Sequence, residues 1–438
     1  MEIKEAGQVK AVCKNIARVA GFHSCLNGQV VSFESGVPGM IMGFTKTDTL
    51  TLILGNEAKV RLGDACFSRA ETFKVPVGEK FLGRVVNALG EPCDDKGKIE
   101  PADYFPVMCE APETMDREPA DSFLETGTTI IDAFVPIAKG QRQMIVGDRM
   151  TGKTTIAVDA ILNQKGKNVI CIYCCIGKSM SSLIKVAGLL KARGALDYTL
   201  IAAAPAASPA GEQYLIPFTA TALAEYFMQK GQDCLVVFDD MTKHAWCYRQ
   251  LSLLLGRPPG REAYPGDIFY LHTQLLERAG KLHREHGGGS ITSLLIVDTL
   301  HGDVTGFIPS NFISMTDGQI YLNADIFKGG FKPAVDIAQS VSIIGSLVQP
   351  QELKEKKSPL RLEYMRYRDL QRLTKLKVGL SAEAESRIKR GEAITALLRQ
   401  DKNTPISLKR QAAFLSALMK GNLDGLSEMQ IEEYKKSV

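Results

Sequence analysis

One segment of the chain matches the phosphate-binding pattern G-x-x-x-x-G-K-[ST] in full: Gly147-Asp148-Arg149-Met150-Thr151-Gly152-Lys153-Thr154. The two glycines of the pattern let successive backbone N–H groups turn inward around phosphate oxygens. The same pattern assigns Lys153 to the β- and γ-phosphates and the Thr154 hydroxyl to Mg²⁺. The segment therefore predicts a site for ATP or ADP together with Mg²⁺.

The residues on both sides of this segment provide the context that the pattern requires. Gln143 to Val146 predicts a buried strand, and Thr155 to Leu162 carries apolar residues at helical spacing. A helix that begins at the loop adds the partial positive charge of its N-terminus. The alternative is a chance match in an ordinary glycine turn. We favour the nucleotide site and extend it to Thr155.

A second candidate residue follows another apolar strand. Cys234 to Phe238 predicts a buried strand, and Asp239 and Asp240 come directly after it. A carboxylate at the end of a strand beside a phosphate loop holds Mg²⁺ directly or through water. The alternative is that one of the two aspartates caps the next helix. We favour the metal role for Asp239, so the predicted metal set is Thr154 and Asp239.

The elements that position these residues fall into three predicted domains. Residues 1–70 contain short strand-like runs separated by Gly, Asn and Asp, which favours a small closed β-barrel. We expect two of its strands at Val9 to Val19 and at Lys59 to Leu62. Residues 71–350 alternate strands with helices, which is typical of an α/β phosphate-loop NTPase domain of the RecA-like kind. Residues 97–125 inside it, rich in Pro, Asp and Glu, predict a linker.

Residues 351–438 predict a small helical domain. Leu, Lys, Arg and Glu dominate, and Pro359 is expected to break the chain before the first helix. Helices are expected over residues 360–378, 381–399, 407–420 and 426–437. A further helix is expected in the preceding domain from Pro217 to Lys230.

The composition excludes several classes of protein. The net charge is +4, from 53 basic and 49 acidic residues, so nothing indicates nucleic-acid binding. No apolar run reaches the ~18 residues that a membrane span needs. The N-terminus resembles neither a signal peptide nor a transit peptide. Ten cysteines without a secretory signal predict reduced thiols in a cytoplasmic setting. Three of them, Cys171, Cys174 and Cys175, lie in a predicted strand and are expected to be buried.

Other segments resemble the alpha subunit of the F-type ATP synthase catalytic head. They are residues 244–278, which include Arg257-Pro258-Pro259-Gly260-Arg261, then Ser314 to Gln319, and Pro333 to Ser342. With the phosphate loop, the resemblance runs from about residue 6 to about residue 415. It implies a ring in which alpha-type and catalytic beta-type chains alternate around a gamma-type central shaft. It also implies a peripheral position on the inner face of the cell membrane, with indirect links to the membrane rotor and stator.

The resemblance also assigns individual residues. Phe327 and Pro333 stand where the family packs the adenine, and Lys332 stands where the family has an arginine. Lys178 stands where beta-type subunits carry the catalytic Glu and alpha-type subunits carry Gln. Lysine is protonated at neutral pH and takes no proton from water, so we expect no catalytic residue in this chain. Ile343 replaces the arginine that the family offers to the neighbouring catalytic site.

These features together predict a regulatory, non-catalytic, ATP-binding alpha-type subunit of an F-type or F-like rotary ATP synthase or ATPase. Its complex would couple ATP synthesis or hydrolysis to the transport of protons or other ions. The chain begins close to the barrel, without the family's N-terminal extension, and its helical domain is expected to be shorter. One alternative is a hexameric ATPase for protein export or nucleic-acid translocation, which needs a catalytic carboxylate near position 178. Another is a structural ring member that never exchanges its nucleotide.

Overall fold

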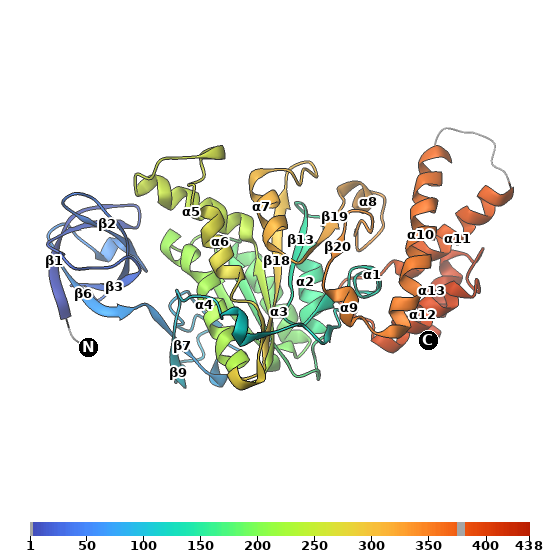
Figure 1. Cartoon of the computed structure of the whole chain (residues 1–438), viewed down its shortest axis with the longest axis horizontal. Coiled ribbons are helices and arrows are strands. Elements are labelled where there is room, and N and C mark those ends of the chain that lie inside the picture. The colour runs from blue at the N-terminus through green and yellow to red at the C-terminus, as the bar shows by residue number, and fades with distance from the viewer. Residues whose placement is uncertain (1–2, 375–381) are drawn as a thin grey trace. The chain divides into compact units, whose positions relative to one another are not determined.

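The computed structural model describes residues 3–374 and 382–438, which form two compact units. The first unit joins Met1–Glu118 to Asn168–Ile296, and the second joins Pro119–Lys167 to Val297–Val438. Figure 1 shows the chain coloured from its N-terminal strands to its C-terminal helices. The units follow a different division from the three predicted domains, whose boundaries at residues 70 and 350 stay predictions.

The N-terminal strands of the first unit close into a barrel, as predicted. In barrel order they are β1 (Ile3–Cys13), β2 (Ile16–Ala20), β5 (Thr49–Ile53), β4 (Pro38–Phe44), β3 (Gln29–Phe33) and β6 (Ala65–Thr72). Val19, Val31, Phe33 and Ile41 are buried in its core. The sequence predicted a barrel because Gly, Asn and Asp separate short β-rich runs, and most of these runs form strands of the closed sheet.

Two of the predicted barrel strands are wrong. Val9 to Val19 contains two antiparallel strands rather than one, because Lys14 and Asn15 adopt φ values of 43° and 68° and reverse the chain. Lys59 to Leu62 is not a strand. Glu57–Lys59 forms a 3₁₀ turn there, and the last barrel strand, β6, begins only after it.

The first unit also contains a parallel sheet. Its strands lie in the order β8 (Val85–Val86), β15 (Thr199–Ala204), β14 (Val169–Ile176), β16 (Asp233–Asp239) and β18 (Ser290–Thr299), whose last residues belong to the second unit. Short pairs are formed by β7 (Lys74–Val77) with β9 (Asp103–Pro106), and by β10 (Arg117–Glu118) with β17 (Gly280–Leu282). The predicted linker over residues 97–125 therefore contains the short strands β9, β10 and β11 (Phe123–Leu124).

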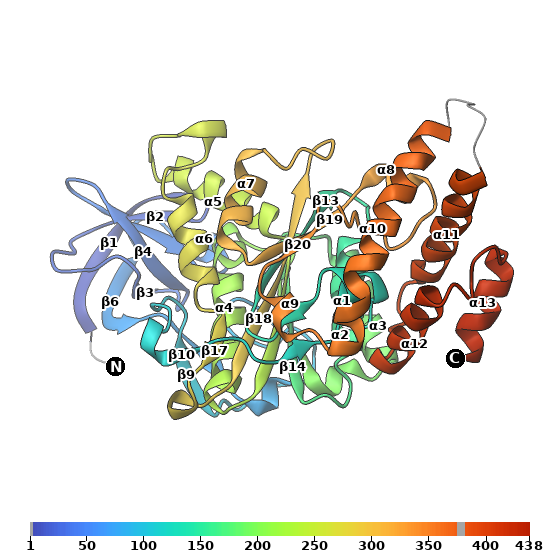
Figure 2. The ribbon, with the colours of Figure 1, turned by 45° about the vertical axis from the view of Figure 1, so that its right-hand side comes forward.

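Helices connect and cover this sheet. They are α3 (Met180–Ala192), α4 (Ala210–Gln229), α5 (Met241–Leu254) and α6 (Ile268–Leu276). The helix α4 contacts β14, β15 and β16, and both views show α4, α5 and α6 as neighbours (Figures 1 and 2). The predicted start of α4 at Pro217 is wrong, and the helix begins at Ala210. Most of α4 is buried, so its packing offsets the hydrogen bond that Pro217 cannot make.

In the second unit, β13 (Arg142–Asp148) pairs with β19 (Gly318–Leu322) in parallel, and β20 (Val341–Ser342) runs antiparallel to β19. A short pair is formed by β11 (Phe123–Leu124) and β12 (Ile137–Ala138). The helices near these strands are α1 (Thr129–Phe134), α2 (Lys153–Leu162), α7 (Phe307–Met315), α8 (Ala324–Lys328) and α9 (Gly345–Val348).

The C-terminal part of the second unit is helical, as predicted. It consists of α10 (Gln351–Thr374), α11 (Ala382–Leu398), α12 (Leu408–Met419) and α13 (Glu428–Ser437). Figure 2 shows α10 beside α11, and the two helices make extensive contacts. Residues 375–381, which the predicted helices 360–378 and 381–399 partly cover, lie outside the described residues.

The predicted break at Pro359 is wrong, because Pro359 lies inside α10. Pro359 is on the exposed side of the helix, whereas Leu353, Leu360, Tyr364 and Tyr367 are buried at helical spacing. An apolar face of this length stabilises the helix on both sides of the proline. Proline alone was therefore a poor guide to where this helix begins.

Candidate nucleotide site

The predicted phosphate loop joins β13 to α2 within the second unit. Gly152, which precedes α2, adopts a φ of 101°, a conformation that favours glycine. At Gly147 a Cβ atom would lie 2.4 Å from the carbonyl oxygen of Leu322, so a larger residue does not fit. The loop therefore has strand, turn and helix in the order that the sequence predicted, and both glycines are required by its geometry.

The Lys153 side chain is held inside this loop. It is only 6% exposed, and its Nζ donates to the carbonyl oxygens of Gly147 (2.7 Å) and Asp148 (2.6 Å). The same ammonium lies 3.0 Å from a carboxylate oxygen of Asp298. Within this loop the ammonium is therefore positioned by two backbone oxygens and the Asp298 carboxylate.

The base of the loop is fixed by hydrogen bonds from residues at and just beyond the end of β18. The Asp148 carboxylate accepts from the Thr299 hydroxyl and from the Gly302 N–H, both at 2.7 Å. The Thr151 hydroxyl donates to the Asp148 carbonyl oxygen at 2.7 Å. The fixed loop fits a phosphate group, because its shape does not have to form upon binding.

The remaining loop residues are more open. Met150 is 92% exposed and has a φ of 64°, and the Arg149 guanidinium lies 3.3 Å from Asp298. Thr154 and Thr155 lie in the first turn of α2 and are half-buried. The Thr154 hydroxyl is an oxygen ligand of the kind that Mg²⁺ takes. Its assignment to Mg²⁺ stays a prediction.

The residues assigned to the adenine lie next to the loop within the same unit. The register of β13 and β19 pairs Gly147 with Leu322, directly before α8. The Lys332 ammonium lies 5.1 Å from the centre of the Phe327 ring. The Pro333 segment returns beside β19, where the Asn323 N–H donates to the Ala334 carbonyl oxygen. The structure therefore brings Phe327, Lys332 and Pro333 to the same edge as the loop.

No sequence pattern indicated Gln400, the residue that connects the Lys332 segment to the helical region. The Gln400 N–H donates to the Lys332 carbonyl oxygen at 2.9 Å. The Gln400 side chain also bonds with Gly127, Thr129 and Thr404. Gln400 lies in a turn between two helices, and a polar residue in such a turn carries no local pattern. Only the fold shows that it positions Lys332.

Asp239 lies in the first unit, at the C-terminal end of β16. It is completely buried, and the Tyr173 hydroxyl donates to one of its carboxylate oxygens at 2.8 Å. The Lys178 ammonium lies 2.5 Å from the other oxygen. Of the two aspartates, Asp240 is the one that caps the next helix. Its carboxylate accepts from the Lys243 N–H at the start of α5.

The ion pair between Lys178 and Asp239 affects whether Asp239 fits a metal ion. Mg²⁺ is held by carboxylates and hydroxyls, whose negative charge or lone pairs it needs. The phosphate loop fits a nucleotide, and Thr154 offers an oxygen. At Asp239, however, the negative charge is already compensated by Lys178, so this carboxylate does not fit a divalent ion in the way the sequence predicted. Thr154 and Asp239 belong to different units, and the two-residue metal set stays a prediction.

The three strand cysteines are buried, as expected. Cys171, Cys174 and Cys175 lie in β14 and have no exposed surface. Burial raises the pKa of the Cys175 thiol to about 12, with a further contribution from the Asp239 carboxylate. These thiols are therefore neutral at physiological pH and unsuited to redox or metal chemistry.

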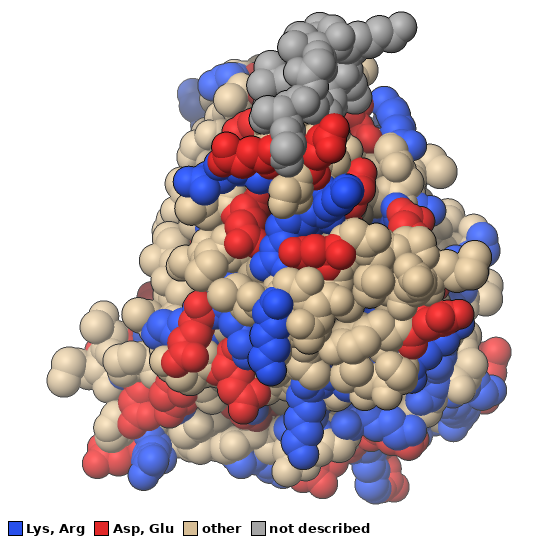
Figure 3. Space-filling model, turned by 90° about the vertical axis from the view of Figure 1, so that its right-hand side faces the viewer, with Lys and Arg blue, Asp and Glu red and all other residues tan. Residues whose placement is uncertain are grey.

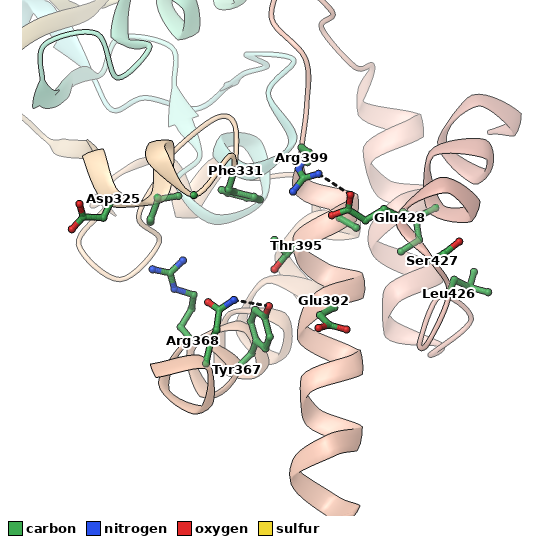
Figure 4. A pocket seen from close by; sticks show the side chains of 15 residues that line it. Asp325, Phe331, Tyr367, Arg368, Glu392, Thr395, Arg399, Leu426, Ser427 and Glu428 are labelled. Carbon is green, nitrogen blue, oxygen red and sulfur yellow. Dashed lines mark hydrogen bonds and ion pairs between the residues drawn. The ribbon is translucent and has the colours of Figure 1, made fainter. Parts of the chain in front are cut away.

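A cavity of about 610 Å³ lies elsewhere in the second unit, among α8, α10, α11 and α13. Figure 4 shows Arg399 beside Glu428. The Arg399 guanidinium lies 3.1 Å from the Glu428 carboxylate. None of the predicted nucleotide residues lines it. We therefore do not assign this cavity to the nucleotide site.

The face around the C-terminal helices carries both charges. Figure 3 shows Lys and Arg interspersed with Asp and Glu there, without a continuous basic stripe among the described residues in view. In residues 3–374 and 382–438, no helix combines the length and hydropathy that crossing a membrane requires.

Comparisons with known proteins give matches over nearly the whole chain. The nucleotide-binding domain of the ATP synthase alpha/beta family matches residues 127–342, and the C-terminal domain of the ATP synthase alpha/beta chain matches residues 349–438. An ATP synthase subunit alpha from Clostridium botulinum is 43% identical over 432 residues, which cover 99% of this chain and 85% of the relative.

Two further relatives carry the same name. The ATP synthase subunit alpha of Petrotoga mobilis is 43% identical over 439 residues, covering 99% of this chain and 87% of the relative. That of Clostridium acetobutylicum is 45% identical over 419 residues, covering 96% and 83%.

Proposed function

Since the chain belongs to the ATP synthase alpha/beta family, we propose that it is a regulatory, non-catalytic alpha-type subunit of an F-type or F-like rotary ATP synthase or ATPase. The family makes it a nucleotide-binding subunit of a rotary ATPase. The proposal adds two points. The chain's own site does not turn over ATP, and the complex couples ATP synthesis or hydrolysis to the transport of protons or other ions.

The observation that carries the proposal is the ion pair between Lys178 and Asp239. By resemblance, position 178 is where hydrolysing subunits carry the glutamate base that takes a proton from water. A lysine whose ammonium is paired with a buried carboxylate is no such base. A self-sufficient hexameric ATPase would need a carboxylate at this position, so the export or translocation alternative has no support from this residue.

The proposed nucleotide is ATP or ADP, with Mg²⁺ as its accompanying ion. The phosphate loop Gly147 to Thr155 would hold the phosphates, with Lys153 as the cation. Phe327, Lys332 and Pro333 would lie at the adenine. The preformed loop and the position of these three residues beside it support this assignment.

The proposed partners are a beta-type catalytic subunit, with which the chain alternates in a hexameric ring, and a gamma-type central shaft. The membrane rotor and stator would be reached indirectly, at the inner face of the cell membrane. The support for these partners is the 43% and 45% identity to ATP synthase alpha subunits over most of their length.

Equilibrium dialysis with labelled ATP tests the nucleotide site. The full chain should bind ATP, and Lys153→Ala should abolish binding, because it removes the cation that the loop holds toward the phosphates. Lys165→Ala, an exposed lysine beyond the end of α2, is the matched control and should bind like the native chain. Unchanged ATP affinity in a folded Lys153→Ala variant would refute the site.

A further inference from the structure

Three cations of α10 form a basic cluster within the second unit: Lys354, Lys357 and Arg361. They follow one another at spacings of three and four residues, so they lie on one face of the helix. The Lys357 ammonium donates to the hydroxyl oxygen of Ser346 in α9, at 2.7 Å, and α9 lies beside α10 in Figure 2. The Arg361 guanidinium donates to the Ile337 carbonyl oxygen at 3.0 Å. Both side chains are therefore held, half-buried, against the part of the chain that leads into α9.

The elements that pack against this half of α10 do not neutralise the basic cluster. Residues 337–350, which include α9, contain no charged side chain. The helices α1 and α12 also pack on α10. The one charged side chain of α1, Asp132, is completely buried and accepts from the Thr126 hydroxyl. The helix α12 contributes cations only, Lys409 and Arg410.

The carboxylates nearest in the sequence are directed elsewhere. Each of three accepts a hydrogen bond from another residue. They are Asp336, Glu355 and Glu363, bonded to Ala338, Gln351 and Arg390 respectively. Glu352 lies two residues before Lys354, on another face of the helix. In the part of the chain that the structure describes, no ion pair joins the basic cluster to a carboxylate.

Lys357 is the middle member of the basic cluster and has a cation on each side. Burial and neighbouring like charges both disfavour the charged form of an amine. Burial, followed by the charges of Arg361 and Lys354, lowers the pKa of the Lys357 ammonium to about 8. Roughly a tenth of such a side chain is neutral at pH 7, and the neutral amine is a nucleophile.

We propose that Lys357 is a site of covalent acylation by acyl phosphates, whose phosphate group the basic cluster attracts. The neutral Nζ attacks the carbonyl carbon, and a bond between nitrogen and carbon forms. The bond between that carbon and the phosphate oxygen breaks, and phosphate leaves with the electron pair. The nitrogen releases one proton to water, and the product is a neutral amide. Lys354 and Arg361 provide the positive charge that pairs with the phosphate oxygens. This modification does not depend on the proposed function.

The test incubates the full chain with acetyl phosphate near neutral pH and follows each lysine by peptide mass spectrometry. Lys357 should be acetylated at least about tenfold faster than Lys165 and Lys185, which are exposed. The rate at Lys357 should rise with pH and level off above about pH 8, because the neutral fraction of the amine is nearly complete above its pKa. Lys357→Arg keeps the charge without this amine and should remove the fast phase of acetyl incorporation.

A neutral acylating reagent, N-hydroxysuccinimide acetate, separates the reactivity of the amine from the attraction of phosphate. At Lys357, the ratio of the rate with acetyl phosphate to the rate with this reagent measures that attraction. Arg361→Gln should lower the ratio at least about threefold. Arg366→Gln removes an exposed arginine from the same helix and should leave the ratio unchanged.

Two results on the native chain would overturn the proposal whether or not the variants fold. One is acetylation of Lys357 that is no faster than that of Lys165. The other is a rate at Lys357 that still rises steeply beyond about pH 9, as for an ordinary lysine. An unchanged ratio in a folded Arg361→Gln variant would overturn the role of the basic cluster in attracting the phosphate.

Discussion

Lys153 and Lys178 are two lysines with different environments and different proposed tasks. Lys153 is buried in the phosphate loop, against carbonyl oxygens of Gly147 and Asp148. Lys178 is partly exposed and contacts one carboxylate, that of Asp239. The pattern around residue 153 is local, so the sequence alone located it. The pair of residues 178 and 239 depends on the register of two strands, which no local pattern shows.

The Tyr173 hydroxyl is expected to contribute to the stability of the folded chain. Burial raises the pKa of this hydroxyl well above the ordinary value, so the group remains a proton donor to Asp239. Tyr173→Phe removes this donor from a buried carboxylate and should lower the free energy of unfolding by about 1–3 kcal/mol in urea denaturation.

Tyr270→Phe is the control for this variant, because Tyr270 is exposed. It should change stability by less than about 0.5 kcal/mol. Equal stabilities for Tyr173→Phe and Tyr270→Phe would show that the hydroxyl does not stabilise the Asp239 carboxylate.

At the scale of elements, a buried ion pair joins α4 to the end of α6. The Arg278 guanidinium donates to both carboxylate oxygens of Glu225, at 2.7 and 2.6 Å, and to the Val107 carbonyl oxygen at 2.6 Å. Arg278→Ala leaves Glu225 as a buried charge without its partner and should destabilise the chain by about 3–5 kcal/mol.

Chemical denaturation of Arg278→Ala measures this loss. Arg284→Ala, an exposed arginine in the same region, should be neutral within about 0.5 kcal/mol. A loss below 1 kcal/mol for Arg278→Ala would contradict a structural role for the pair.

Two buried histidines join α5 and α6. The Nδ1 of His244 lies 3.3 Å from the Nε2 of His272, and burial lowers the pKa of His244 to about 4 and that of His272 well below 6.5. The unfolded chain takes up protons below about pH 6.5, whereas the folded chain does not. The stability that neutral His244 contributes is therefore full above pH 6.5 and is lost as the pH falls toward 4.

Unfolding free energies at several pH values test this. We expect the native chain to lose up to ~1.4 kcal/mol per pH unit for such a group over this window. His244→Gln should have a shallower slope, and His23→Gln, an exposed histidine, should keep the native slope. Identical slopes for the native chain and His244→Gln would contradict the pKa shift of His244.

Elements with a strong periodic pattern were predicted well, and their ends were not. The barrel followed from short β-rich runs separated by Gly, Asn and Asp, and the C-terminal helices followed from a sequence rich in Leu, Lys, Arg and Glu. The predicted helix starts at Pro217 and after Pro359 were wrong, because packing of the surrounding helix outweighs the hydrogen bond that proline lacks. The hairpin at Lys14 and Asn15 was missed, because neither residue is the glycine that such turns usually contain.

At the scale of the whole molecule, the activity of the proposed ring depends on position 343, where this chain has isoleucine and the family, by resemblance, has arginine. Ile343 is 67% exposed between β20 and α9. In related heads an arginine from this position stabilises the transferring phosphate in the neighbour, where a fixed cation contributes a factor of ~10³–10⁵ in rate. Isoleucine contributes none of it, so we expect slow hydrolysis in a reconstituted complex, confined to the beta-type partner.

The test compares the rate of ATP hydrolysis by the native complex with that of the Ile343→Arg complex, both at saturating ATP. This variant should hydrolyse ATP at least about tenfold faster than the native complex. Leu347 is 75% exposed on α9, so Leu347→Arg controls for the addition of a surface cation. This variant should not hydrolyse ATP faster than the native complex. Lys332 and Arg261 are the candidates on this chain for a cation that replaces the arginine from another position. Native turnover near ~10² s⁻¹ that neither Lys332→Ala nor Arg261→Ala lowers would contradict the view that this cation is missing or relocated.

Whether the nucleotide site is non-catalytic is tested by adding labelled ATP to the purified full chain and quantifying bound nucleotide and released phosphate together. We predict that the bound ATP stays intact, with turnover far below ~1 s⁻¹. Steady phosphate release at ~1 s⁻¹ or faster, absent in Lys153→Ala, would contradict a non-catalytic nucleotide site.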